Sequence, residues 1–242
     1  MWIHEGVKQM DHGFDNVTVC GKLCYVFMCM ERYLLALYPD RDWSFVARKM
    51  WNCVSFWYGK RDVEDDCWVW GRYMDIIPDN LFETRRKWAH YSHELREEYY
   101  GEMTDDDYRS IREYGDIALI GYENFCKTLD LFEDITEGNR DEELVQMFYI
   151  PVDMWEKCET SDYNLEVGNE AAQEAIEKIE NILKAHNIAL PDSSPVLEFT
   201  PENTDPHTLS WIAEESKISN CDKWGFAVKA DHLSQLITGP EY

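Results

Sequence analysis

The chain has 242 residues, of which 45% are hydrophobic and 14% aromatic, and it carries a formal net charge of −25. This composition supplies enough apolar side chains for a folded core and excludes a disordered chain, because disordered segments are poor in aromatic residues. The negative charge opposes binding to nucleic acid or to an anionic membrane surface, whose phosphates have the same sign.

The first predicted element is a helix over residues 15–38, with Asp15 as its N-cap and Pro39 beyond its end. Hydrophobic residues surround most of this segment, which is typical of a helix that is buried on nearly all sides. The sequence therefore predicts a mainly α, multi-helix, bundle-like domain with this helix at its centre. The most apolar run, residues 23–30, is too short to span a bilayer, which needs about 20 residues.

Helical patterns continue through the middle of the chain. We expect helices over residues 42–60, 63–77, 80–100 and about 104–131, then two shorter pieces, 141–151 and 151–158, separated by Pro151. A further helix is expected from Asn169, with Ala172, Ala175, Ile176, Ile179, Ile182 and Leu183 on its inner side.

The C-terminal part has a different pattern. Residues 194–202 and 223–230 show strand-like alternation, whereas 207–216 and 231–237 look like short helices. We therefore expect a small mixed α/β region at this end of the chain. The predicted division is a helical domain over 1–160 and a second unit over 161–242, with a single domain as the alternative.

The N-terminus shows no secretory signal, so we expect a cytoplasmic protein. None of the eight cysteines forms a C-x-x-C pair, and free buried thiols are the expected state without export. The chain also lacks G-x-S-x-G, Walker A and G-x-G-x-x-G motifs, so the sequence indicates no cofactor and no catalytic residue.

His90 and His93 are the one candidate for a metal site. Their order, H-x-x-H-E, matches neither the H-E-x-x-H helix of zinc proteases nor the Glu-x-x-His pattern of di-iron bundles. At about 100° per residue both histidines lie opposite the apolar stripe that contains Trp88. We interpret them as residues of a solvated helix face and predict no metal site.

Charge is distributed unevenly along the chain. Residues 1–96 contain 13 basic and 14 acidic residues, whereas residues 97–242 contain 10 and 34. Between residues 94 and 107 seven acidic residues accompany a single base, Arg96, and two tyrosines. Carboxylates interleaved with aromatic rings suit a contact with Lys and Arg side chains of another protein. The predicted partner-binding residues are Glu94, Glu97, Glu98, Tyr99, Tyr100, Glu102, Asp105, Asp106 and Asp107.

These features favour a non-enzymatic acidic binding protein that sequesters a basic protein partner. Immunity proteins of nuclease toxins and inhibitors of nucleic-acid enzymes work by this physics, and the analogy here rests on charge alone. Two alternatives remain open. One is a metal-dependent or acid-base helical enzyme that uses His90, His93 and nearby carboxylates, and the other is a helical scaffold or ligand-binding domain with an apolar cavity.

Overall fold

The computed structural model describes residues 13–55, 73, 76–79, 122–136, 141–161, 164–203 and 230–237. In this part of the chain the fold is mainly α, as predicted, and contains no strand. The α-helices are α1 (Val19–Leu37), α2 (Ser44–Ser55), α8 (Tyr122–Thr136), α9 (Glu142–Thr160) and α10 (Leu165–Ala185). The 3-10 helices are η1 (Phe14–Asn16), η4 (Ser194–Glu198), η5 (Pro201–Asn203) and η6 (Asp231–Leu233).

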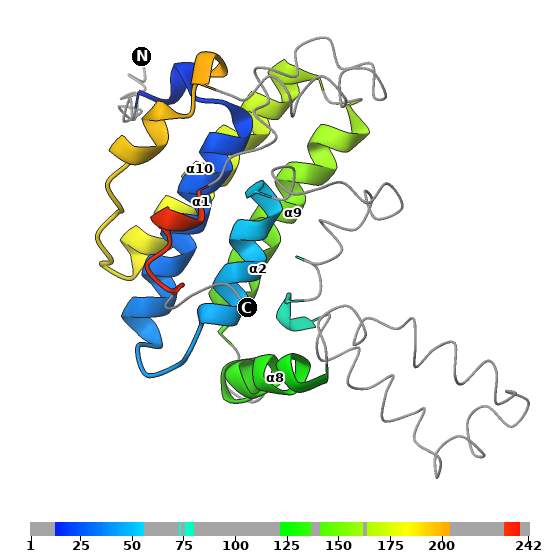
Figure 1. The fold of residues 1–242 in the computed structure, drawn as a ribbon, viewed down its shortest axis with the longest axis vertical. Coiled ribbons are helices and arrows are strands. Elements are labelled where there is room, and N and C mark those ends of the chain that lie inside the picture. The colour runs from blue at the N-terminus through cyan, green and yellow to red at the C-terminus, as the bar shows by residue number, and fades with distance from the viewer. Residues whose placement is uncertain are drawn as a thin grey trace, which may run out of the picture.

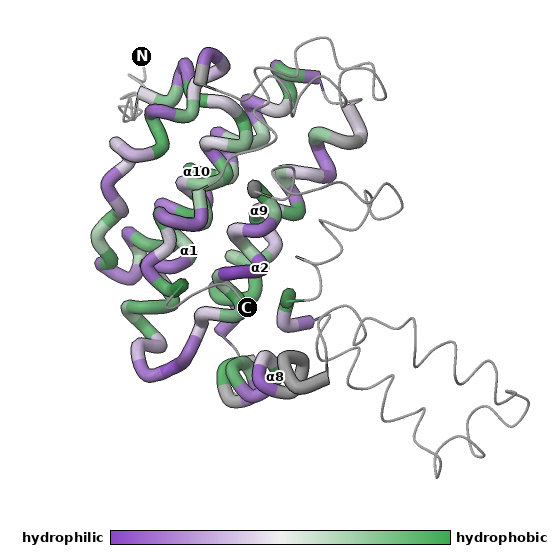
Figure 2. Tube along the Cα trace, in the orientation of Figure 1, coloured by the Kyte–Doolittle hydropathy of each residue, from purple (hydrophilic) through white to green (hydrophobic). Residues whose placement is uncertain are grey.

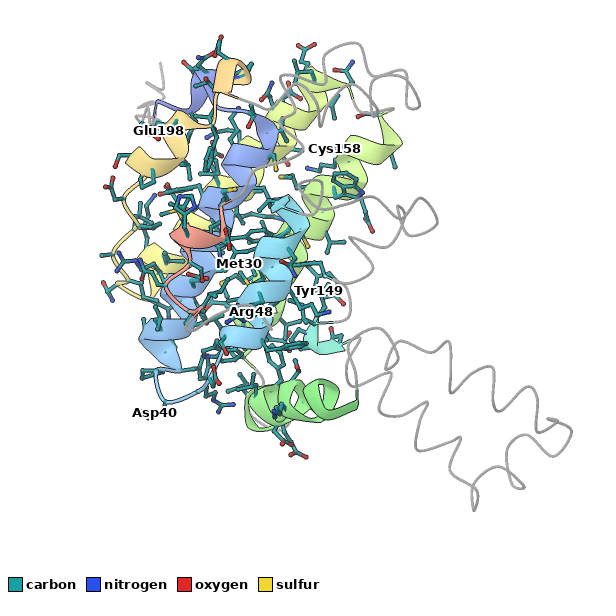
Figure 3. All side chains as sticks on the ribbon, in the orientation of Figure 1. Met30, Asp40, Arg48, Tyr149, Cys158 and Glu198 are labelled. Carbon is teal, nitrogen blue, oxygen red and sulfur yellow. The ribbon has the colours of Figure 1, made fainter. Side chains whose placement is uncertain are left out.

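Helix α1 is the central helix of the described fold. It contacts α2, α9 and α10, and these helices lie around it in Figure 1. Most of its residues are buried, and Met30 is completely covered between α1 and its neighbours (Figure 3). Full burial of a large apolar side chain contributes about 1.5–3 kcal/mol, so the helix is stabilised by its surroundings on every side.

The start of α1 differs from the prediction. Thr18, not Asp15, is the N-cap, and its hydroxyl accepts a hydrogen bond from the backbone N–H of Gly21 at 3.1 Å. Asp15 lies in η1, outside the helix. Both residue types can cap a helix, and the extended backbone of Thr18 decides which of them does so.

Helix α9 continues through Pro151, so the predicted separation into two pieces is wrong. A proline inside a helix removes one backbone donor and crowds the carbonyl four residues earlier. Here the helix is held by burial on both sides of the proline, at Phe148 and Met154. In addition, the buried Tyr73 donates its hydroxyl proton to the carbonyl of Phe148 at 2.8 Å, in the turn that precedes Pro151.

Helix α10 begins four residues earlier than predicted. Asn164 is its N-cap, and the side-chain oxygen accepts from the N–H groups of Glu166 and Val167. The predicted inner side is confirmed, with Ile182 only partly covered. Helix α10 packs against both α9 and α1, and hydrophilic and hydrophobic residues alternate along it (Figure 2). The division into units 1–160 and 161–242 stays a prediction.

The described C-terminal segments form 3-10 turns. Residues 194–202, which we expected as a strand, form η4 and the start of η5 instead. Pro195 is the second residue of η4, and the backbone carbonyl of Phe199 accepts from the N–H of Thr18 at 2.9 Å. The expected helix 231–237 is reduced to η6, which contacts α2. The expected elements 63–77, 80–100, 207–216 and 223–230 lie almost wholly outside the described residues.

Helix α8 joins the rest of the fold through aromatic side chains. The ring of Phe132 lies 5.4 Å from that of Trp43 and 5.5 Å from that of Phe148. All three residues are almost completely buried. This row of rings ties α8 to α9 and to the turn before α2, at the end of the bundle where Figure 1 shows α8 crossing. The helix ends at Thr136, five residues beyond the predicted end.

Candidate functional site

The predicted partner surface over residues 94–107 lies outside the described residues, as do His90 and His93. A candidate binding site can therefore be described only from polar and charged residues elsewhere in the described part of the chain. Among the described residues, no group of three His, Cys, Asp or Glu side chains has the geometry of a metal site. No helix of this part is long and apolar enough to cross a membrane.

An open groove of about 550 Å³ lies beside the N-terminal halves of α1 and α10. All six residues that line it have polar or charged side chains, which supply one amine, three carboxylates and two amides. We call it the Lys22 groove, and it is lined by Asp15, Lys22, Asn169, Glu170, Gln173 and Glu174.

Two local features place these residues together. The Thr18 cap starts α1 so that Lys22 falls in its first turns, while η1 carries Asp15 just before the helix. On α10 the lining residues follow a helical spacing of one, four and five positions from Asn169, which keeps them on one side of the helix. Helices α1 and α10 are in contact, which brings Lys22 and the α10 residues to the same groove.

Lys22 is the most unusual residue of the groove. Only 6% of its surface is exposed, although the ammonium group is strongly hydrated in water. Its Nζ donates a hydrogen bond to Oδ1 of Asn169 at 2.7 Å. Burial lowers the pKa of the Lys22 amine, and the nearby carboxylate of Asp15 opposes that shift. The side chain is thus held in place beside a polar hollow.

The carboxylates of the groove are exposed, in contrast to Lys22. Glu166, Glu170 and Glu174 follow one another at four-residue spacing, so they form an exposed acidic stripe along α10. Glu174 also pairs with Lys157 of α9, and both side chains of this pair are more than half exposed. Such a pair contributes at most about 1 kcal/mol and can open when another cation approaches.

Other polar clusters in the fold have structural partners. Asp141 accepts from the hydroxyls of Tyr33 and Tyr38 and from the N–H of Leu144, so it ties α1 to the start of α9. Buried Glu180 accepts from Tyr25 at 3.1 Å and from Lys184 at 2.8 Å. These carboxylates are occupied by intramolecular contacts between helices.

The five described cysteines are free, as expected. Burial raises the pKa of the Cys20 thiol to about 12 and that of Cys158 to about 12. Burial likewise raises the pKa of Cys24 well above its usual value. Since the thiolate is the reactive form, burial disfavours the reactive state of these thiols at neutral pH.

Lys22 and the residues of its groove are not among the site residues predicted from the sequence. One signal was present, because Lys22 is the only basic residue in the apolar stretch from Val17 to Met30. A lone lysine in a helix that is otherwise buried must either extend to solvent or find a polar site inside the fold. Which of these occurs depends on Asn169, which is 147 positions away in the chain.

Comparisons with protein-family models, with curated proteins and with solved structures found no match for this chain.

Proposed function

We propose that this chain is an acidic binding protein for a basic protein partner, and that the Lys22 groove and the acidic stripe of α10 form part of the contact. One observation carries the proposal: Asp15 and Glu170 present exposed carboxylates to the same groove. A concave surface that combines exposed carboxylates and amides suits the Lys and Arg side chains of another protein.

The overall charge supports the same conclusion. At −25, the chain attracts a cationic protein from a distance and increases the rate of their encounter. The acidic residues 94–107 belong to the same proposal, as a second acidic part of the contact. In this proposal the long-range charge brings the partner close, and the groove selects individual basic side chains.

The proposal is tested with two variants of equal charge change. Asp15→Asn/Glu170→Gln removes two groove carboxylates, whereas Asp40→Asn/Asp130→Asn removes two exposed carboxylates elsewhere. The immobilised chain is used to capture partners from a native lysate, and the affinity of the captured protein is then measured at several salt concentrations.

We expect a captured protein with a high isoelectric point, bound more weakly as salt increases. Two ion pairs of about 0.2–1 kcal/mol each predict about 2- to 30-fold weaker binding by the groove variant. The matched control should keep nearly full affinity. Recovery of only neutral or acidic partners, or equal losses in the two variants, would show that the proposal is wrong.

A further inference from the structure

The ammonium group of Lys22 forms no ion pair within the described fold, although the carboxylate of Asp15 is near enough to oppose the lowering of its pKa. Its one hydrogen-bond partner there is the neutral amide of Asn169, and no described carboxylate forms an ion pair with it. Buried charges in proteins are normally paired, because an isolated ion loses its hydration without compensation. Only 6% of the surface of Lys22 is exposed, yet its side chain lines an open groove. The groove thus offers a buried positive charge to a ligand.

The rim of the groove offers the opposite charge. Asp15 and Glu170 are exposed and take part in none of the ion pairs found among the described residues. Glu174 adds a third carboxylate, shared with Lys157. A simple anion would be repelled by these groups, and a simple cation would be repelled by Lys22. A ligand that satisfies both parts must carry one negative group and at least one positive group.

Along α10 the rim carboxylates lie at two distances from Asn169: Glu170 is the next residue, and Glu174 is further along the helix. Asn169, which holds Lys22, and Glu174 are five residues apart, which corresponds to about 7.5 Å along the helix axis. An extended lysine or arginine side chain covers such a span. A carboxylate suits Lys22 better than a phosphate does, because a single ammonium among several carboxylates cannot balance a dianion.

We propose that the Lys22 groove binds a lysine or arginine residue that ends in a free carboxylate. The carboxylate accepts hydrogen bonds from Lys22 Nζ, and the basic side chain lies between Asp15 and the glutamates of α10. This chemistry has two sources, the C-terminal residue of a protein and the free amino acid. The inference rests on the proposed function, since it names the group of the basic partner that the groove selects.

The test compares small probes on the full chain by titration calorimetry at low salt. The probes are N-acetyl-glycyl-lysine with a free carboxylate, the same dipeptide as its C-terminal amide, N-acetyl-glycyl-norleucine with a free carboxylate, and free L-lysine. We expect the first probe to bind at least about tenfold more tightly than the amide or the norleucine compound, since each of these lacks one charged contact. Free lysine that binds as tightly as the dipeptide identifies the amino acid as the source, and weaker binding identifies a protein C-terminus.

Two variants test whether Lys22 causes the difference in binding between the acid and amide probes. Lys22→Met should remove the difference between the acid and amide probes, whereas Lys178→Met, which removes an exposed lysine of the same helix α10 as the rim, should preserve it. If Lys22→Met does not fold, the comparison of the acid with the amide on the unaltered chain still decides. Equal binding of these two probes, or binding of none, overturns the inference. Salt-dependent capture of a basic protein together with equal probe binding would overturn this inference alone and leave the proposed function in place.

Discussion

The indole Nε1 of Trp51 donates a hydrogen bond to the carboxylate of Glu31 at 2.7 Å, and both residues are almost completely buried. The same carboxylate accepts from the hydroxyl of Ser234 and, at 2.6 Å, from the backbone N–H of Gln235. Glu31 therefore joins α1, α2 and the C-terminal segment 230–237 at one point. Glu31 and its C-terminal partners, Ser234 and Gln235, are more than 200 positions apart in the chain.

This joint predicts a specific pH dependence of stability. Burial raises the pKa of Glu31 above its ordinary value of 4.5, although its hydrogen bonds oppose the shift. A raised folded-state pKa means that the contribution of Glu31 to stability is fully present below pH 4.5 and is lost as pH rises through the folded-state pKa. Glu31→Gln removes this titration. As the pH rises from 4.5 through the folded-state pKa of Glu31, we expect the free energy of unfolding of the natural chain to fall relative to that of Glu31→Gln.

Urea unfolding of the two proteins at a series of pH values measures the difference. Subtracting the variant curve cancels the titration of the other carboxylates. Parallel curves through the acidic range would contradict the raised pKa of Glu31.

The contacts of Asp141 predict that its substitution lowers the stability of the fold by a large amount. Its carboxylate accepts from Tyr33 at 2.9 Å, from Tyr38 and from the N–H of Leu144 at the start of α9. Asp141→Ala removes a helix cap, worth about 0.5–2 kcal/mol, and leaves two partly buried hydroxyls without their acceptor. We expect the free energy of unfolding to fall by about 2–4 kcal/mol.

Thermal and chemical unfolding measure this loss. Tyr38→Phe serves as a comparison, since it removes one donor and leaves the cap, and it should cost less than Asp141→Ala. A loss below about 0.5 kcal/mol for Asp141→Ala, the level of an ordinary surface substitution, would contradict the role of this residue as a joint.

The close packing around Gly21 predicts that Gly21→Ala destabilises the fold, although the residue lies inside a helix. Alanine is favoured over glycine by about 1 kcal/mol in a helix interior, so helix propensity alone predicts stabilisation. A methyl group at Gly21, however, would lie 2.8 Å from Cβ of Phe199 and 2.8 Å from a methyl carbon of Val17. Since Cβ of Phe199 is fixed to its backbone, we expect Gly21→Ala to lower the stability by about 1–3 kcal/mol. A higher melting temperature for the variant would show that η4 does not pack this closely on α1.

The burial of the cysteine thiols predicts that they are chemically modified slowly in the folded chain. Cys24, Cys29 and Cys53 are buried, and burial raises the pKa of each of them. Iodoacetamide reacts with thiolates, so the folded chain at pH 7.5 should leave these residues unmodified while denatured chain is labelled fully. Peptide mass spectrometry after a timed reaction resolves each site. Rapid labelling of Cys24 in the native protein would contradict its burial in the core.

Part of this fold follows directly from local sequence. The apolar residues of segment 15–38 predict a buried central helix, and the spacing of Ala172, Ala175 and Ile179 predicts the inner side of α10. Such patterns are local, since each residue needs only its neighbours in the helix to show which side faces the core. The predicted acidic contact at residues 94–107 stays a prediction.

Tertiary contacts decided the features that the local pattern got wrong. Pro151 was expected to end a helix, yet burial of the surrounding turns and the hydroxyl of Tyr73 accommodate it within α9. Residues 194–202 alternate like a strand but have no neighbouring strand among the described residues, and they form turns on α1. A strand requires a partner that supplies backbone hydrogen bonds, and alternation alone does not provide one.

The sequence by itself determined the helical class, the net charge and the burial of α1, because composition and helical periodicity act over a few residues. Only the tertiary structure decided that Lys22, Asn169 and Asp15 meet in one groove and that Glu31 holds the C-terminal segment. These relationships join residues that are 147 and more than 200 positions apart. The packing of α1 against α10 and α2 brings them together, and no local pattern in the chain encodes such a distance.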